Sequence, residues 1–159
     1  MKKISITFAV ATLLLCSAQA TKAQAYKTAL GVAIDLGDGP TLAGPQIKHS
    51  FDGKNAGNAQ VLFSDRHTVI GVDYSYNEAF RGTNGLGWYV GIGPQIDIVD
   101  LEPFDDKTYF GIRPAAGLEY KIPTAPLAFH FDWKPWWNLT NDSDFEASRF
   151  TLGFKFTLK

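Results

Sequence analysis

The chain has 159 residues, of which 15 are basic and 16 acidic, so its formal net charge is −1 at pH 7. This balance excludes the basic surplus that is typical of nucleic-acid-binding proteins. The only cysteine is Cys16, which excludes an intramolecular disulfide scaffold.

The first 25 residues have the pattern of an export signal. Two lysines precede an almost wholly apolar run over residues 4–15, which is too short to cross a bilayer as a helix because that takes roughly 20 residues. Small residues follow, and both 18–20 and 23–25 fit the small-x-small cleavage pattern. We predict cleavage after Ala25, with Ala20 as the alternative, because an alternating pattern begins directly beyond.

The mature chain, residues 26–159, is expected to form one domain. Residues 1–25 hold three of the 15 basic residues and none of the acids, so the mature chain has 12 basic and 16 acidic residues and a net charge of −4. Leu15 stands before Cys16, where lipid attachment would need a small residue. We therefore expect neither a lipoprotein nor a disulfide after cleavage.

Beyond residue 25, large apolar residues alternate with small or polar ones at a period of two, which is typical of β-strands. Stretches rich in Gly, Pro, Asp and Asn separate these segments and predict turns. In chain order we predict eight strands, the second and third from weaker patterns, over residues 28–36, 41–52, 58–64, 68–76, 86–98, 109–121, 129–134 and 149–158.

Three prolines interrupt these patterns. Pro94, Pro114 and Pro135 lie within predicted strands, and each removes a backbone donor from the sheet. We expect bulges or strand ends at these positions. The sequence Gly-Pro-Gln-Ile also occurs twice, at 44–47 and 93–96; a repeat this short reflects either related hairpins or chance, and chance is the simpler reading.

The two faces of the predicted strands differ in size and polarity. In the last segment the apolar face is large and aromatic, whereas the other face is small or charged: Phe150, Leu152, Phe154, Phe156 and Leu158 against Arg149, Thr151, Gly153, Lys155 and Thr157. Eight such apolar faces turned inward would overfill a small barrel. Turned outward they form a lipid-facing band, and the small and charged residues fit the interior. The pattern therefore predicts an all-β, antiparallel, up-and-down transmembrane β-barrel.

The chain resembles the small outer-membrane β-barrel family of Gram-negative bacteria, the OmpX- and OmpA-like eight-stranded barrels. The resemblance covers residues 26–159 and rests on the export signal, on 117–120 before a tight turn, on 131–135 after it, and on the final alternating segment 150–158. It implies residence in the cell outer membrane and insertion by the barrel-assembly machinery. The family usually ends on an aromatic residue, whereas this chain ends in Lys159.

Charged residues on the predicted inner face are the candidate site. Buried charges must be paired, so we expect a structural polar network that fills the barrel, or alternatively a gated ion path or solute site. The network is predicted from Asp73, Asp97, Arg113, Glu119, Lys121, Asp132, Lys134, Arg149 and Lys155, with Gln46 and Gln95 on the same face. Five of these nine charges are basic and four acidic, which fits a closed plug better than a single-sign pore.

His130 and Asp132 share one strand face, and a histidine held by an acid can act as a general base. No serine stands beside them in the sequence, so we expect no catalytic residues. His49 and His67 lie near turns without metal-ligand spacing. We expect no metal, no cofactor and no enzyme activity.

The predicted function is an integral outer-membrane barrel with a structural or surface-interaction role, in contact with outer-membrane lipid and monomeric, with an external partner that the sequence does not identify. A narrow channel or small-solute porin is the main alternative. A soluble ligand-binding barrel and a membrane lipid hydrolase are further alternatives. With an even strand count, both chain ends and the turn at 123–126 should face the periplasm, and the loops near Asp105 and Asp142 should face outward.

Overall fold

The computed structural model describes residues 26–101, 103, 105–140 and 143–158. The predicted export signal, residues 1–25, and Asp142 lie outside them. No helix in this described part is long and apolar enough to cross a membrane. The strands are β1 (Thr28–Gly37), β2 (Leu42–Ser50), β3 (Asn55–Phe63), β4 (His67–Ala79), β5 (Leu86–Val99), β6 (Lys107–Lys121), β7 (Leu127–Trp133), β8 (Trp136–Asn138), β9 (Asp144–Glu146) and β10 (Arg149–Leu158).

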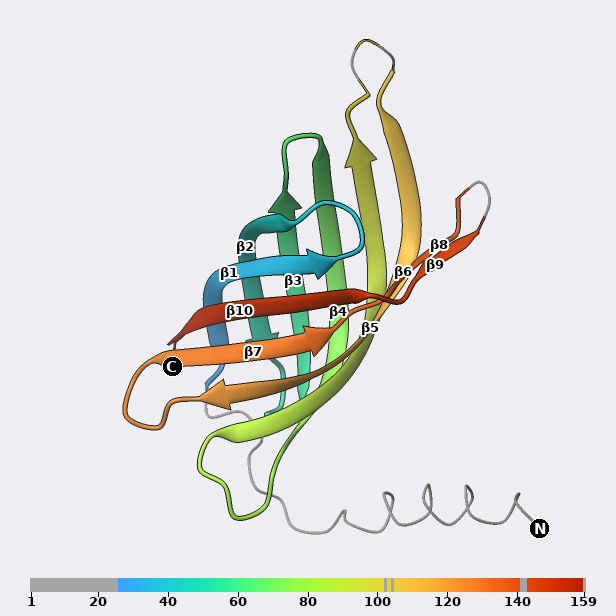
Figure 1. The fold of residues 1–159 in the computed structure, drawn as a ribbon. Helices are drawn as coiled ribbons and strands as arrows, with labels where there is room; N and C mark the ends of the chain where they lie inside the picture. Colours follow the sequence, from blue (N-terminus) through green and yellow to red (C-terminus); the bar gives the residue numbers. More distant parts are fainter. Residues whose placement is uncertain (1–25, 102, 104, 141–142, 159) are drawn as a thin grey trace, which may run out of the picture.

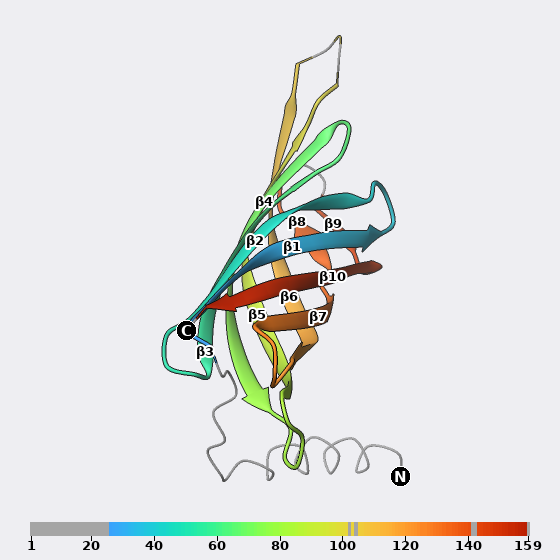
Figure 2. The same cartoon turned by 90° about the vertical axis from the view of Figure 1, so that its left-hand side faces the viewer.

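The strands close into an antiparallel barrel in which β1 to β7 pair in chain order, β10 lies between β7 and β1, and β8 pairs with β6 and β9 (Figures 1 and 2). The first strand closes it: β1 pairs with β2 on one side and with β10 on the other, from Thr28 opposite Leu158 to Gly37 opposite Arg149. The short β8 continues the line of β7, and β9 leads into β10. Counted in this way, the barrel wall has eight strands. The predicted eight-stranded antiparallel barrel is confirmed.

The break between β7 and β8 falls at Lys134 and Pro135. Proline has no N–H for the ladder, whereas the amide of Lys134 donates to the carbonyl oxygen of Arg149 at 2.9 Å. Beyond the break β8 pairs with β6 at Gly111 and Ile112. The β8–β9 hairpin leans away from the barrel wall (Figure 1).

The repeated Gly-Pro-Gln-Ile segments occupy equivalent places in β2 and β5. In each, the Gly-Pro step is missing from the ladder on one side, β2 with β3 and β5 with β4. The carbonyl oxygens of Val61 and Val72 lie where a Cβ would project from Gly44 and Gly93. Each proline faces outward and each glutamine inward. The repeat thus marks two places where neighbouring backbones approach closely.

Large apolar side chains point away from the barrel, and polar ones point into it. Phe154 is 45% exposed, whereas its neighbour Lys155 is 2% exposed. Among the described residues, the buried apolar side chains include two small clusters, one of Ala33, Leu42, Leu62 and Val69 and one of Tyr26, Ala29 and Ala128. The described part of the chain is therefore polar inside and apolar outside, as the alternation predicts.

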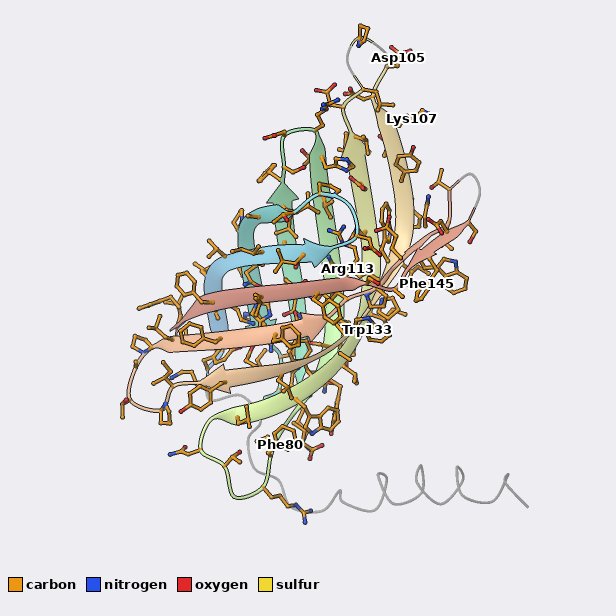
Figure 3. The ribbon with its side chains drawn as sticks, in the orientation of Figure 1. Phe80, Asp105, Lys107, Arg113, Trp133 and Phe145 are labelled. Carbon is orange, nitrogen blue, oxygen red and sulfur yellow. The ribbon has the colours of Figure 1, made fainter. Side chains whose placement is uncertain are left out.

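The two ends of the barrel differ in shape. We call the end at which Thr28 and Leu158 pair the terminal end; its turns cover 51–54, 80–85 and 122–126. The opposite loop end carries 38–41, 64–66 and the connections from β5 to β6 and from β8 to β9. With 14 and 15 residues, β5 and β6 are the longest strands, and their hairpin rises beyond the rest of the barrel (Figures 1 and 2). Asp105 and Lys107 lie near its tip (Figure 3).

Candidate functional site

The structure places eight of the nine predicted network residues inside the barrel. Each is between 0% and 7% exposed and extends from an inward-facing strand position: Asp73, Asp97, Arg113, Glu119, Asp132, Lys134, Arg149 and Lys155. They come from β4, β5, β6, β7, β10 and the break before β8. Because charges this deep are tolerated only when paired, their partners define what the lumen can do.

Lys121 is the exception and corrects the prediction. It is the last residue of β6, next to the turn, and it is only half-buried. Its Nζ donates to the carbonyl oxygens of Ile122 and Ala125, both at 2.7 Å. At a strand end a lysine reaches the unpaired carbonyls of its own turn, so Lys121 fixes the turn at the terminal end rather than joining the lumen network.

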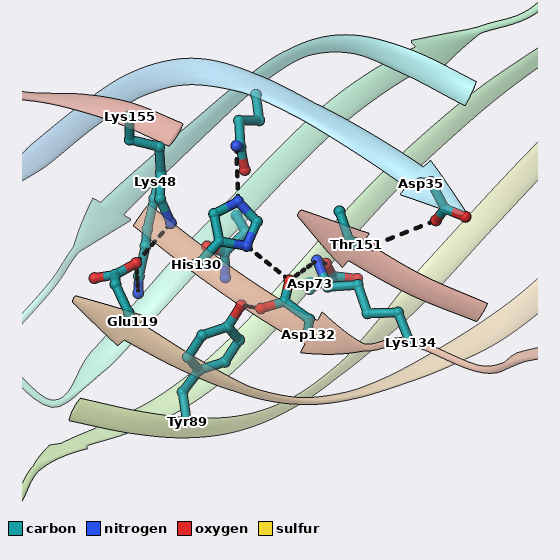
Figure 4. Close-up of polar contacts among 12 residues, drawn as sticks. Asp35, Lys48, Asp73, Tyr89, Glu119, His130, Asp132, Lys134, Thr151 and Lys155 are labelled. Atoms are coloured by element: carbon teal, nitrogen blue, oxygen red, sulfur yellow. Dashed lines mark hydrogen bonds and ion pairs between the residues drawn. The ribbon is translucent and has the colours of Figure 1, made fainter. Parts of the chain in front are cut away.

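The half of the lumen near the terminal end is organised around Glu119 (Figure 4). Lys155 and Lys48 donate to its Oε2 at 2.6 and 3.1 Å, and the Tyr26 hydroxyl donates to its Oε1 at 2.6 Å. Lys48 also donates to Asn77 at 2.8 Å. One carboxylate thus holds two ammonium groups and a phenol in a side-chain plug that crosses from β2 to β6 and β10.

The middle of the lumen is organised around Asp132. It accepts hydrogen bonds from the Tyr89 hydroxyl and lies 3.0 Å from His130 Nδ1 and 3.4 Å from Lys134 Nζ. The other ring nitrogen of His130 lies 2.8 Å from the amide nitrogen of Gln46. Both ring nitrogens are therefore engaged by side chains that are not nucleophiles, which favours a structural role for His130 over general-base catalysis.

Asp73 links the middle of the lumen to the loop end. It accepts from Arg113 Nη2 at 3.0 Å and lies 3.4 Å from Lys134 Nζ. Lys134 thus bridges Asp73 and Asp132 (Figure 4). With its amide oxygen turned toward the guanidinium, Gln60 accepts from Arg113 Nη1 at 2.6 Å. These contacts extend the plug across β3, β4 and β6.

The half near the loop end holds a separate ion pair and an open cavity. Arg149 donates to Asp35 Oδ1 through Nε at 2.8 Å and through Nη2 at 2.5 Å, and to the carbonyl oxygen of Asp38 at 2.7 Å. His67 Nδ1 lies 3.4 Å from Asp97 Oδ1. Beside these groups is a cavity of about 50 Å³, the vestibule, lined by Asp35, Asp38, Pro40, Leu42, His67, Val69, Gln95, Asp97, Arg113, Lys134, Trp136, Glu146 and Arg149.

Sequence reasoning left three important residues out of the network. Asp35 lies on the inner face of the first predicted strand, Lys48 lies in a weakly patterned segment, and Tyr26 precedes the first strand. With Lys48 and Asp35 included and Lys121 removed, the fully buried charges of the described lumen are five acids and five bases: Asp35, Asp73, Asp97, Glu119 and Asp132 against Lys48, Arg113, Lys134, Arg149 and Lys155. The balance is that of a closed plug.

No group of three or more His, Cys, Asp or Glu side chains among the described residues is arranged to hold a metal ion.

No protein-family model and no curated protein matches the chain. Among solved structures, it is similar to the N-terminal β-barrel domain of Pseudomonas aeruginosa OprF, with a TM-score of 0.64 and 14% sequence identity over 81% of this chain and 96% of that domain. It also matches Neisserial surface protein A, with a TM-score of 0.44 and 12% identity over 82% of this chain and 94% of the other. The first likeness shows that this chain has the fold of that barrel domain.

Proposed function

We propose that the chain is an integral outer-membrane β-barrel with a structural or surface-interaction role and with a lumen closed to solutes. The observation that carries this proposal is the inverted distribution of side chains. Phenylalanines and aliphatic residues cover the outer wall, whereas paired charges fill the interior. An apolar surface of this extent is unfavourable in water, and it is favourable in contact with lipid.

Backbone hydrogen bonding supports the same environment. In lipid every backbone N–H and C=O must find a partner within the protein, so a spanning sheet has to close. Closure through β1 and β10 meets this requirement over ten paired positions. Aromatic rings also gather where a membrane interface would lie: Trp133 donates its indole N–H to the carbonyl of Ala147, and Trp137 donates to Ser143.

In this proposal the terminal end faces the periplasm and the loop end faces the outside. The β5–β6 hairpin with Asp105 and the β8–β9 hairpin with Phe145 then offer the surfaces for an external partner (Figure 3). The barrel is monomeric, is inserted by the barrel-assembly machinery and carries out no catalysis. The engagement of both His130 nitrogens supports the last point.

A narrow channel is the second candidate, and the vestibule favours it because it opens the loop end of the lumen. The plug around Glu119 and Asp132 opposes it, because these side chains cross the interior below the vestibule. Planar-bilayer recording separates the two candidates. The closed barrel predicts no steady conductance, whereas large, steady single-channel currents would establish the channel.

Orientation and membrane insertion are tested with introduced cysteines, since the only cysteine of the chain is Cys16. The Asp105→Cys variant should react with a membrane-impermeant maleimide in intact cells, and the Thr124→Cys variant should react only after lysis. The protein should also stay with outer membranes through alkaline extraction. Labelling of Thr124→Cys alone in intact cells would reverse the orientation, and recovery as a detergent-free soluble monomer would exclude membrane insertion.

A further inference from the structure

The vestibule holds buried polar atoms that have no hydrogen-bond partner within the described structure. They are Gln95 Oε1, Asp97 Oδ1, Arg113 Nε and Trp136 Nε1. All four residues line the cavity, and Gln95, Asp97 and Arg113 are only 5%, 5% and 1% exposed. A buried polar group without a hydrogen bond destabilises the folded state. Four such atoms around one cavity therefore point to something that binds there.

Two glycines flank Gln95, and other side chains occupy the space beside them. In the strand register Gln95 lies opposite Gly71 on β4 and opposite Gly111 on β6. The guanidinium of Arg113 lies 2.7 Å from where a Cβ of Gly71 would be, and the indole nitrogen of Trp136 lies where a Cβ of Gly111 would be. The Gln95 amide therefore lies between two strand positions that are covered by the Arg113 guanidinium and the Trp136 indole. Larger residues in place of Gly71 and Gly111 would displace these two groups.

One buried acid beside the vestibule has no permanently charged basic partner. Near the terminal end Glu119 is matched by two lysines. The rest of the buried lumen has four acids and three bases: Asp35, Asp73, Asp97 and Asp132 against Arg113, Lys134 and Arg149. All three bases contact acids other than Asp97. Among the ion pairs of the described residues, Asp97 contacts only His67, and that pair is ionic only when the imidazole is protonated.

We propose that the vestibule binds a small solute that carries an ammonium group next to a hydrogen-bond acceptor, for which ethanolamine and glycine are the simplest probes. The ammonium group donates to Asp97 Oδ1 and Gln95 Oε1. The acceptor oxygen receives hydrogen bonds from Arg113 Nε and Trp136 Nε1. Each of the four unpartnered atoms gains a partner of the right type, and the excess acid gains a cation.

Other ligand classes match this arrangement less well. An anion could accept from Arg113 and Trp136, but it would stand beside the acceptor oxygens of Asp97 and Gln95. A neutral polyol could satisfy the hydrogen bonds but would leave the carboxylate of Asp97 without a counter-charge. The proposal goes beyond a surface-interaction role, because it assigns the outer half of the lumen its own ligand while the plug below stays closed.

The test uses the purified protein refolded in detergent micelles and ¹H–¹⁵N spectra of its indole and side-chain amide groups. The chain has four tryptophans, and the Trp136→Phe variant identifies the Trp136 signal. Ethanolamine should shift the Trp136 indole and Gln95 amide signals in a saturable manner and leave the other three indoles unchanged. Glycine should do the same, whereas acetate, glycerol and sodium chloride at equal concentration should not.

The Asp97→Asn variant keeps the shape of the side chain but removes its charge. It should weaken ethanolamine binding about tenfold or more, since a hydrogen bond to a charged group is worth more than a neutral one. The matched control is Asp65→Asn, which changes an exposed acid on a neighbouring loop and should leave binding unchanged. A non-saturable shift, an equal response to acetate, glycerol or sodium chloride, or full binding by Asp97→Asn would each overturn the proposal.

Discussion

Both halves of the lumen contain a buried carboxylate, but the two carboxylates differ in their hydrogen bonding. Near the terminal end Glu119 accepts from three donors, and its neighbours Lys48 and Lys155 are each at most 2% exposed. Near the loop end Asp97 is equally buried, yet its Oδ1 has no hydrogen bond within the described structure. Burial alone therefore does not distinguish a structural carboxylate from a candidate binding group.

The difference follows from strand geometry. At the terminal end short turns hold the strands together, and long side chains from β2, β6 and β10 meet across the narrow interior. At the loop end β5 and β6 extend beyond their neighbours, and the Arg113 guanidinium and the Trp136 indole lie beside the two glycines opposite Gln95. One half of the barrel is packed by its own charges, and the other half leaves polar atoms facing a cavity.

The largest expected effect comes from neutralising the acid at the centre of the packed half. In Glu119→Gln the ammonium groups of Lys48 and Lys155 lose their counter-charge, and breaking a buried ion pair costs about 3–5 kcal/mol. The Asp97→Asn change in the open half should alter the free energy of unfolding by less than about 1 kcal/mol, since few contacts are lost. Urea titration in phospholipid vesicles measures both values. Equal destabilisation by the two variants would remove the distinction between the halves.

The next largest effect tests which side of the wall is the inside, on which the whole comparison depends. Phe154 lies mid-strand on the outer face of β10, where its ring centroid is 6.4 Å from that of Phe129. Phe154→Arg should cost roughly 2–4 kcal/mol at the bilayer midplane, and Phe150→Arg, near the loop end of the same face, about 0–1 kcal/mol. The same vesicle titration compares them. A harmless Phe154→Arg would mean that this face does not contact lipid.

Most of the fold was predictable from the sequence because strand alternation is a local property. The parity that places Phe154 outward also places Lys155 inward, and all eight predicted strands occur. The partners were not predictable, because register across the closed barrel decides them. Glu119 meets Lys48, which is 71 positions away in the chain.

The residues that were missed have physical reasons. Lys48 lies in β2, where Gly44 and Pro45 interrupt the ladder and blur the alternation. Lys121 has the correct parity, but it lies at the strand end, where its own turn offers carbonyl oxygens. The vestibule was not foreseen, since contacts across the barrel place the Arg113 guanidinium and the Trp136 indole beside Gln95.

A smaller effect compares single hydroxyl groups from the two ends. The Tyr26 hydroxyl donates to buried Glu119 at 2.6 Å, whereas the exposed Thr140 hydroxyl accepts from the Phe110 amide at 2.8 Å. Tyr26→Phe should cost about 1.5–3 kcal/mol because the acceptor is charged, and Thr140→Val about 0.5–1.5 kcal/mol. Unfolding midpoints in vesicles give both numbers. A larger loss at Thr140 would mean that the loop end is the more tightly held.

The smallest effect concerns the turn at 51–54, at the terminal end. The Asp52 carboxylate accepts from the backbone N–H of Asn55 at 2.6 Å, from the side chain of the same residue at 2.5 Å and from the N–H of Lys54 at 2.9 Å. These hydrogen bonds, the Asn55 amide first, lower the pKa of Asp52 below its ordinary value.

Because the folded-state pKa of Asp52 is depressed, its contribution to stability is present above the unfolded pKa, about 3.9, and is lost as the pH falls through the folded pKa. Asp52→Asn resembles the protonated side chain. The wild-type protein should therefore have a slightly higher urea midpoint than this variant at neutral pH, and the two midpoints should converge in acid. A difference that stays constant into strong acid would mean that Asp52 acts in this turn through its shape rather than its charge. In that case the charge of this carboxylate would not stabilise the turn, whereas charge pairing does stabilise the packed half of the lumen around Glu119.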